Sequence, residues 1–113
     1  MSAKRNSTTN ETALVRACLH YLHIRGVVAW RANTGANTYE SKGTRRFVRF
    51  GPKGQADIMG VMPPNGRALA IECKMRNRPT TAQQRAFLEH VRAAGGLSAV
   101  VHDVEELSAV LDG

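Results

Sequence analysis

The segment Ala68-Leu69-Ala70-Ile71-Glu72-Cys73-Lys74-Met75 decides the fold, because it joins a short apolar run to two charged residues near its end. A run of this length and composition is typical of a β-strand. Side chains alternate between the two faces of a strand, so Glu72 and Lys74 share one face. The opposite face then holds two aliphatic residues and a cysteine: Leu69, Ile71 and Cys73.

Asp57 stands in a second short segment of the same kind, Gly54-Gln55-Ala56-Asp57-Ile58-Met59-Gly60. Charged side chains among apolar neighbours are unfavourable unless they pair with something or bind something. A divalent metal held by the carboxylates of Asp57 and Glu72, beside a lysine that meets phosphate, would explain both acids and Lys74. These three residues form the centre of the candidate site.

The remaining pattern predicts one domain in which helices and strands alternate. We expect helices at about residues 9–25, 81–94 and 104–111, and strands at about 27–33, 44–50, 56–61, 67–74 and 97–102. Residues 1–8 are expected to form a flexible tail before a domain at 9–113, and residues 34–43 a polar, mobile loop. The short links between the earlier strands predict antiparallel pairs, whereas the last strand can return parallel through a helix. The predicted class is α/β, with one small mixed sheet flanked by helices.

Each long helix carries a polar residue one turn before its apolar stripe. The stripe of the first helix is Leu14, Val15, Cys18, Leu19 and Leu22, and that of the second is Phe87, Leu88 and Val91. Glu11 and Gln84 precede these stripes, so both should face the sheet. Local alternatives stay open: Glu11 could form a capping box with Thr8, and Gln84 could be a partly exposed residue at a helix start.

The charge of the chain predicts a polyanionic partner. The 113 residues include 16 Lys and Arg against 9 Asp and Glu, giving a net charge of +7. This balance favours nucleic acid, with a solvated basic surface as the alternative. The cations gather in one run without acids and in a second run directly after Glu72: Lys42, Arg45, Arg46, Arg49 and Lys53, then Lys74, Arg76 and Arg78.

The sequence gives no sign of a membrane or secreted protein. No apolar run is long enough to span a bilayer, and no apolar stretch follows the charged N-terminus as a secretion signal requires. Cys18 and Cys73 have neither metal-type nor disulfide spacing. We therefore expect a cytoplasmic protein.

Histidines and aromatic residues predict no further site. His20 and His23 lie off the apolar stripe, which favours solvated histidines over a zinc pair. No partner pattern accompanies His90 and His102. Two aromatic residues could stack on bases but are more often core residues when they lie on strands: Trp30 and Phe47.

The chain resembles the VRR-NUC family, the virus-type replication-repair branch of the PD-(D/E)xK nucleases. The resemblance spans roughly residues 10–111 and rests on an ordered set: Glu11, Gly54-x-x-Asp57, Glu72-x-Lys74 and Gln84. Flanking segments agree, at residues 30–35, 45–51 and 81–87. Cys73 departs from the family pattern, where an aliphatic residue is usual, but only its backbone carbonyl is expected at the metal.

The resemblance implies a restriction-endonuclease-like αβββαβ core and a metal-dependent DNA endonuclease. It implies that Mg²⁺ or Mn²⁺ is held by oxygen ligands from Glu11, Asp57, Glu72 and the backbone carbonyl of Cys73. Lys74 would position water or neutralise charge on the phosphate, and Gln84 would orient Lys74, the water or the phosphate. The expected DNA contacts are Arg31, Asn33, Lys42, Arg45, Arg46, Arg49, Lys53, Arg76 and Arg78.

The resemblance also implies a homodimer that cuts branched DNA, such as four-way (Holliday) junctions, in repair, recombination or phage replication. Twofold symmetry would supply the two sites that symmetric cutting of two strands needs. Two alternatives stay open. The protein could be a DNA-binding module without enzymatic activity, whose acids are structural, or a nickase of the same fold that acts on flaps or single strands.

Overall fold

The computed structural model describes residues 7–32, 36–41, 44–49 and 52–113, and only the backbone of residues 7–9, 36–41 and 44–49. Its elements are α1 (Ser7–Ile24), β1 (Val28–Arg31), β2 (Ala36–Ser41), β3 (Thr44–Arg49), β4 (Ile58–Met62), β5 (Arg67–Cys73), α2 (Ala82–Ala93), β6 (Leu97–Val101) and α3 (Val104–Asp112). The predicted helices and strands are confirmed to within about two residues at each end, the usual uncertainty of such boundaries.

Four strands form one mixed sheet in the order β1-β4-β5-β6. Strands β1 and β4 are antiparallel, as are β4 and β5, whereas β5 and β6 are parallel. Helix α2 makes the connection between the parallel strands, because a parallel return needs a crossover. The predicted α/β class and the predicted strand directions are therefore confirmed.

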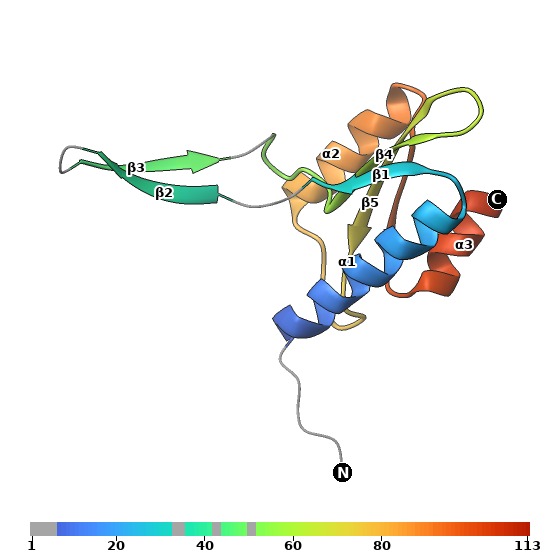
Figure 1. Cartoon of the computed structure of the whole chain (residues 1–113), viewed down its shortest axis with the longest axis horizontal. Coiled ribbons are helices and arrows are strands. Elements are labelled where there is room, and N and C mark those ends of the chain that lie inside the picture. The colour runs from blue at the N-terminus through green and yellow to red at the C-terminus, as the bar shows by residue number, and fades with distance from the viewer. Residues whose placement is uncertain (1–6, 33–35, 42–43, 50–51) are drawn as a thin grey trace, which may run out of the picture.

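Helices cover both faces of the sheet, with α1 and α3 on one side and α2 on the other (Figure 1). The larger core lies under α1 and α3 and contains Val15, Cys18, Leu22, Val27, Ile58, Leu69, Ile71, Cys73, Val101 and Leu107. The smaller core lies under α2 and contains Ala56, Ala70 and Leu88, with Met59, Phe87, Val91 and Val100 packed against it. The predicted apolar stripes of both long helices are thus confirmed.

Strand β5 is buried on both faces from Leu69 to Cys73. The predicted division of its side chains holds: alternate residues from Leu69 enter the larger core, while Ala70 enters the smaller one. Glu72 lies two residues beyond Ala70, so it faces α2. A central strand with two covered faces reads as a nearly continuous apolar run, and Glu72 is the exception that needs a reason.

Strands β2 and β3 form a separate two-stranded sheet that projects away from the main sheet (Figure 1). They pair antiparallel from Ala36 opposite Arg49 to Ser41 opposite Thr44. The expected loop at residues 34–43 is therefore wrong for residues 36–41, whereas its mobility without DNA stays a prediction, and the expectation of a single sheet is wrong as well. The error has a physical cause, since cross-strand pairing gives a polar segment hydrogen bonds that its own composition does not reveal.

The start of α1 corrects one alternative for Glu11. Residues 1–6 of the predicted tail lie outside the described residues, and α1 already begins at Ser7. Thr8 therefore lies inside the helix and cannot be the N-cap of a capping box with Glu11. In the part of the chain that the structure describes, no helix has both the length and the apolar character of a membrane span.

Strand β1 is an edge strand with an uncovered face. Trp30 is 48% exposed, so the expectation that it belongs to the core is wrong. Helix α2 packs against β5 and β6 and leaves the β1 side of its sheet face without a covering helix. The side chain of Phe47 lies outside the described residues.

Candidate active site

Glu72 is a carboxylate inside the α2 layer with only 2% of its surface exposed. Its Oε2 accepts a hydrogen bond from Gln84 Nε2 at 2.9 Å and lies 3.9 Å from Lys74 Nζ. Its Oε1 is equally buried and has no hydrogen-bond partner among the described residues. Such an oxygen is unfavourable in a folded core, so Glu72 is left with an open position for a cation or a donor.

Gln84 is oriented by the capping box that starts α2. Its backbone N–H donates to Thr81 Oγ1 at 3.1 Å, and its Oε1 accepts from the backbone N–H of Thr81 at 2.9 Å. Because the cap uses the side-chain oxygen, the amide nitrogen remains as a donor and reaches Glu72. Gln84 therefore lies at the helix start and also faces the sheet, as predicted.

Asp57, the residue directly before β4, lies near Glu72. Its Oδ2 accepts a hydrogen bond from the backbone N–H of Cys73 at 2.9 Å. Within a strand, the N–H and C=O of one residue point to the same neighbour, so the Cys73 carbonyl also faces this side. The Cys73 thiol belongs to the opposite core, where it meets Cys18, and both thiols are free.

Gly54 determines how closely the Asp57 loop approaches α2. Its φ of +79° suits glycine, and a Cβ there would lie 2.4 Å from the carbonyl oxygen of Gln83. Gln55 donates from Nε2 to the carbonyl oxygen of Ala32 at 3.2 Å, which ties the same loop to the end of β1. The spacing of Gly54 and Asp57 therefore has a structural reason, because this turn places the acid beside the first turn of α2.

The pKa values of both carboxyl groups are raised above their ordinary values. Burial, followed by the charge of Asp57, raises the pKa of Glu72 to about 8. Burial also raises the pKa of Asp57, and the charge of Glu11 adds to the rise, while the hydrogen bond from Cys73 opposes it. The pair therefore binds protons more tightly than isolated carboxyl groups would, and a positive charge at this position would displace them.

Glu11 lies at the margin of this pair. It is half-buried in α1, and its charge acts on the pKa of Asp57. Within residues 7–32, 36–41, 44–49 and 52–113, however, no three His, Cys, Asp or Glu side chains converge closely enough to hold an ion. The structure thus places Glu11 within electrostatic reach of Asp57 but does not gather Glu11, Asp57 and Glu72 into one ion-binding group.

The residues present nevertheless fit a divalent cation. Asp57 and Glu72 offer oxygen ligands, which suit Mg²⁺ and Mn²⁺. One Glu72 oxygen has no other partner among the described residues, and the charge of Asp57 raises the pKa of Glu72, so the two acids repel each other when both are ionised. A bound cation would satisfy the oxygen and relieve the repulsion.

Two cations flank the acids. The Lys74 side chain is 15% exposed and points its ammonium group at Glu72, which confirms that both lie on one face. Arg31 is exposed at the end of β1. The charges of Lys74 and Arg31 both lower the pKa of Asp57, so each lies within electrostatic reach of the acid pair.

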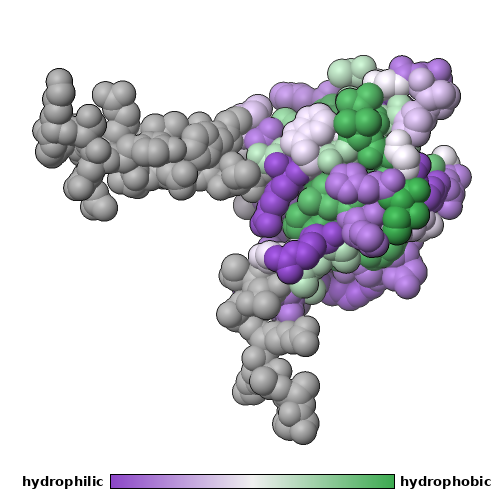
Figure 2. Space-filling view, in the orientation of Figure 1, coloured by the Kyte–Doolittle hydropathy of each residue, from purple (hydrophilic) through white to green (hydrophobic). Residues whose placement is uncertain are grey.

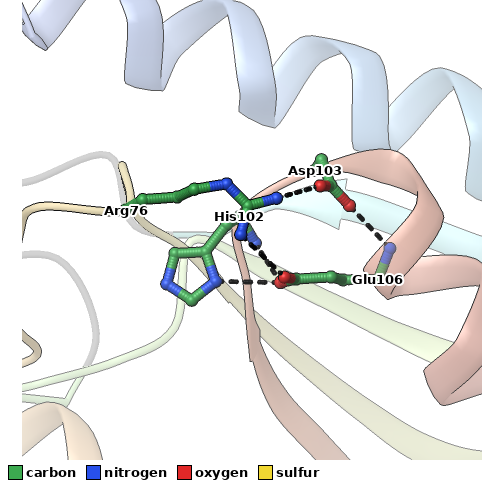
Figure 3. Close-up of polar contacts among 4 residues, drawn as sticks. All are labelled: Arg76, His102, Asp103 and Glu106. Carbon is green, nitrogen blue, oxygen red and sulfur yellow. Dashed lines mark hydrogen bonds and ion pairs between the residues drawn. The ribbon is translucent and has the colours of Figure 1, made fainter.

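Arg76 anchors the segment after Lys74 to the start of α3 (Figure 3). Its guanidinium pairs with Asp103 and lies 3.3 Å from Glu106 Oε2. Asp103 is the N-cap of α3 and accepts from the backbone N–H of Glu106 at 2.7 Å. The predicted DNA contact at Arg76 thus belongs to a side chain that two acids of its own chain already engage.

His102 completes this anchor, a contact that no pattern in the sequence predicted. Glu106 Oε1 accepts from the backbone N–H of His102 at 2.7 Å and contacts His102 Nδ1 at 2.8 Å (Figure 3). The hydrogen bonds from His102 lower the pKa of Glu106. Directly beside them, the backbone N–H of Lys74 donates to the carbonyl oxygen of Val101 at 3.0 Å. The end of β5, and with it Lys74, is therefore fixed from the α3 side.

The other predicted DNA contacts are only partly described. Asn33 and Lys42 lie outside the described residues. Arg45, Arg46 and Arg49 lie on β3, whose backbone alone is described. Lys53 is exposed in the turn before Gly54, and the backbone N–H of Arg78 donates to the carbonyl oxygen of Met75 at 3.0 Å.

Two helix-capping motifs in the sequence bear on the site. Thr81 and Gln84 have the spacing of a capping box, as do Asp103 and Glu106 in a related form. The first would have predicted the orientation of Gln84. The second would have predicted the start of α3, although nothing local indicates that Arg76 and His102 join it.

No protein-family model matches this chain, and a search of curated proteins finds no matching relative.

We expect Glu72 to make the metal-free protein less stable as the pH rises from about 4.5 to about 8. The folded state keeps the Glu72 proton up to a pKa of about 8, whereas the unfolded chain releases it near the ordinary value of 4.5. Unfolding therefore releases a proton in this window, and the free energy of unfolding should fall by roughly 1–4 kcal/mol. Thermal or urea unfolding in EDTA should show this fall in the wild type and not in Glu72→Gln.

The exposed Glu89 on α2 supplies the matched control, since Glu89→Gln changes the same charge outside the site. Its stability should follow the wild type at every pH. Parallel curves for the wild type and Glu72→Gln would mean that Glu72 titrates as an ordinary carboxyl group.

Proposed function

We propose that this protein is a metal-dependent nuclease that hydrolyses phosphodiester bonds in DNA, with the restriction-endonuclease-like core of the VRR-NUC nucleases. The observation that carries the proposal is the buried Glu72 with the half-buried Asp57 beside it, one Glu72 oxygen without a partner among the described residues, and Lys74 next to Glu72. Buried acids with raised pKa values next to a lysine are typical of functional sites. The net charge of +7 agrees with a polyanionic substrate.

In this proposal Asp57 and Glu72 hold Mg²⁺ or Mn²⁺, with Glu11 and the Cys73 carbonyl as further candidate ligands. When bound, the ion supplies positive charge for the scissile phosphate and makes the attacking water more acidic. Gln84 keeps one Glu72 oxygen in place, so the other oxygen stays available. Lys74 is only 3.9 Å from Glu72, so it can stabilise the charge that develops on the phosphate oxygens.

The rival function is DNA binding without cleavage. It draws support from the described part of the chain, in which no three His, Cys, Asp or Glu side chains lie close enough together to hold a metal ion. The unpartnered Glu72 oxygen favours the nuclease, because a purely structural acid would be expected to have both oxygens satisfied.

Cleavage of DNA should require Mg²⁺ or Mn²⁺ and should stop in EDTA. Asp57→Asn and Glu72→Gln should each abolish it, because each removes one negative ligand without changing the shape of the side chain. Lys74→Ala should slow it by roughly 100-fold or more. Labelled linear, flapped and branched DNA, incubated with each metal, provides the measurement.

Glu89→Gln again serves as the control and should cut like the wild type. Asp57→Asn and Glu72→Gln should keep or gain stability without metal, because repulsion between the acids is reduced. Tight DNA binding by the wild type, with no cut in any substrate with either metal, would favour the binding module instead.

The basic strand β3 should contact the DNA backbone. Replacing Arg45, Arg46 and Arg49 together with Gln should weaken binding to all DNA sequences and reduce the slope of affinity against salt by up to about three. Fluorescence anisotropy at several salt concentrations measures this slope. Arg92→Gln, on α2, should leave it unchanged. An unaltered slope in the triple variant would place the DNA elsewhere.

The working unit should be a homodimer that cuts four-way junctions. One chain of this size carries one candidate site, and a twofold axis supplies the second site that symmetric cutting of two strands needs. Sedimentation at micromolar concentration should give twice the chain mass, and a four-way junction should be cut faster than a linear duplex of matching sequence. A clean monomer, or equal rates on the two substrates, would favour a nickase of flaps or single strands.

A further inference from the structure

An apolar surface patch lies on β1 and β4 where no helix covers the sheet. Its members are Val28, Trp30 and Val61, which are 64%, 48% and 39% exposed. Val28 lies opposite Val61, and Trp30 lies opposite Met59, so the side chains of all four residues project from one face. Figure 2 shows apolar side chains at the surface above β1, with hydrophilic side chains around them.

The strand register places this patch on the same sheet face as the acid pair. Met59 and Ala70 are directly paired and belong to the core under α2. Asp57 precedes Met59 by two residues and Glu72 follows Ala70 by two, so the acids occupy the next row on this face. Trp30 on β1 and Asp57 before β4 are thus diagonal cross-strand neighbours, whose positions are typically about 7–8 Å apart.

Charge around the patch favours a nucleic acid over an apolar protein surface as its occupant. Arg31 directly follows Trp30 and acts on the pKa of Asp57, as does Lys74. Lys53 is exposed in the turn that leads to Asp57. The half-exposed indole, one row from the acid pair, and the two cations that flank that pair, Lys74 and Arg31, offer partners for both parts of a nucleotide. The cations suit the phosphate, and the indole face suits the base.

We propose that Trp30 stacks on an unpaired nucleobase next to the phosphate that is cut. This inference rests on the proposed nuclease function and names its substrate class: DNA with at least one unstacked nucleotide at the cleavage point. A base inside a regular duplex is stacked on both sides and cannot present its face to a side chain on a sheet. A branch point, flap or single strand can present such a base.

Trp30 is the only tryptophan in the chain, so its fluorescence reports on this contact without any cleavage. We expect a single-stranded oligonucleotide to quench the fluorescence of the Glu72→Gln variant in EDTA, and a duplex of the same sequence to quench it much less. In anisotropy, Trp30→Ala should weaken binding of the single strand by roughly tenfold and binding of the duplex by less than twofold. Trp30→Phe should retain most of the affinity, because it keeps an aromatic face.

Ile24→Ala is the matched control, since Ile24 is 68% exposed at the end of α1 and lies outside the patch. It should bind both DNAs like the parent protein. Absence of quenching by the single strand, or equal losses for single strand and duplex in Trp30→Ala, would overturn the inference. The quenching experiment needs no Trp30 variant, so the test holds even if Trp30→Ala folds poorly.

Two further results separate this inference from other possibilities. Trp30 emission that changes with protein concentration, together with dissociation of subunits in Trp30→Ala, would assign the patch to a subunit interface and overturn the inference. Selective quenching by single strands in a protein that never cuts DNA would refute the proposed nuclease and leave the stacking surface in place.

Discussion

Glu72 is buried on the central strand, and the rest of the site follows from the need to stabilise its carboxylate there. Strand β5 is buried on both faces from Leu69 to Cys73, so protein groups rather than water must stabilise Glu72. Gln84 comes from α2, Asp57 from the residue before β4, and Lys74 from the end of β5 itself. Even with these neighbours, one oxygen has no partner among the described residues. The folded chain therefore maintains an unsatisfied acid, which a purely structural design would avoid.

The two faces of the sheet differ in how much apolar core they carry. The face under α1 and α3 carries the larger core, in which Leu69, Ile71 and Cys73 hold β5 in place. The face under α2 carries fewer apolar residues, and α2 covers only part of it. Three further features hold α2 in place: the capping box at Thr81, the close packing of Gly54 against the helix, and the hydrogen bond from Ser98 Oγ to the carbonyl oxygen of Leu88 at 2.7 Å. The larger core on the opposite face can offset the unfavourable burial of the acid pair on this one.

Much of this arrangement could be predicted from the sequence, because it depends on short periodicities. Alternation along β5 places Glu72 and Lys74 together, and helical spacing places Gln84 toward the sheet. The features that could not be predicted from the sequence also have a physical reason. The strand β2 depends on pairing with β3, the exposure of Trp30 depends on how far α2 extends, and the partners of Arg76 and His102 lie in α3. Contacts between distant elements leave no local pattern, so composition and periodicity could not reveal them.

The anchor at α3 shows how such distant contacts serve the site. In the proposed nuclease, Lys74 must keep its position when the charge on Glu72 changes, and the raised pKa of Glu72 means that this charge varies near neutral pH. Lys74 follows the last residue of β5, where a strand end would ordinarily be free to move. The Lys74 backbone instead bonds to Val101, and Arg76 holds the next turn against Asp103 and Glu106 (Figure 3). Two of the basic residues that follow Glu72 thus have different tasks: Lys74 faces the acid pair, and Arg76 keeps the backbone of Lys74 in place.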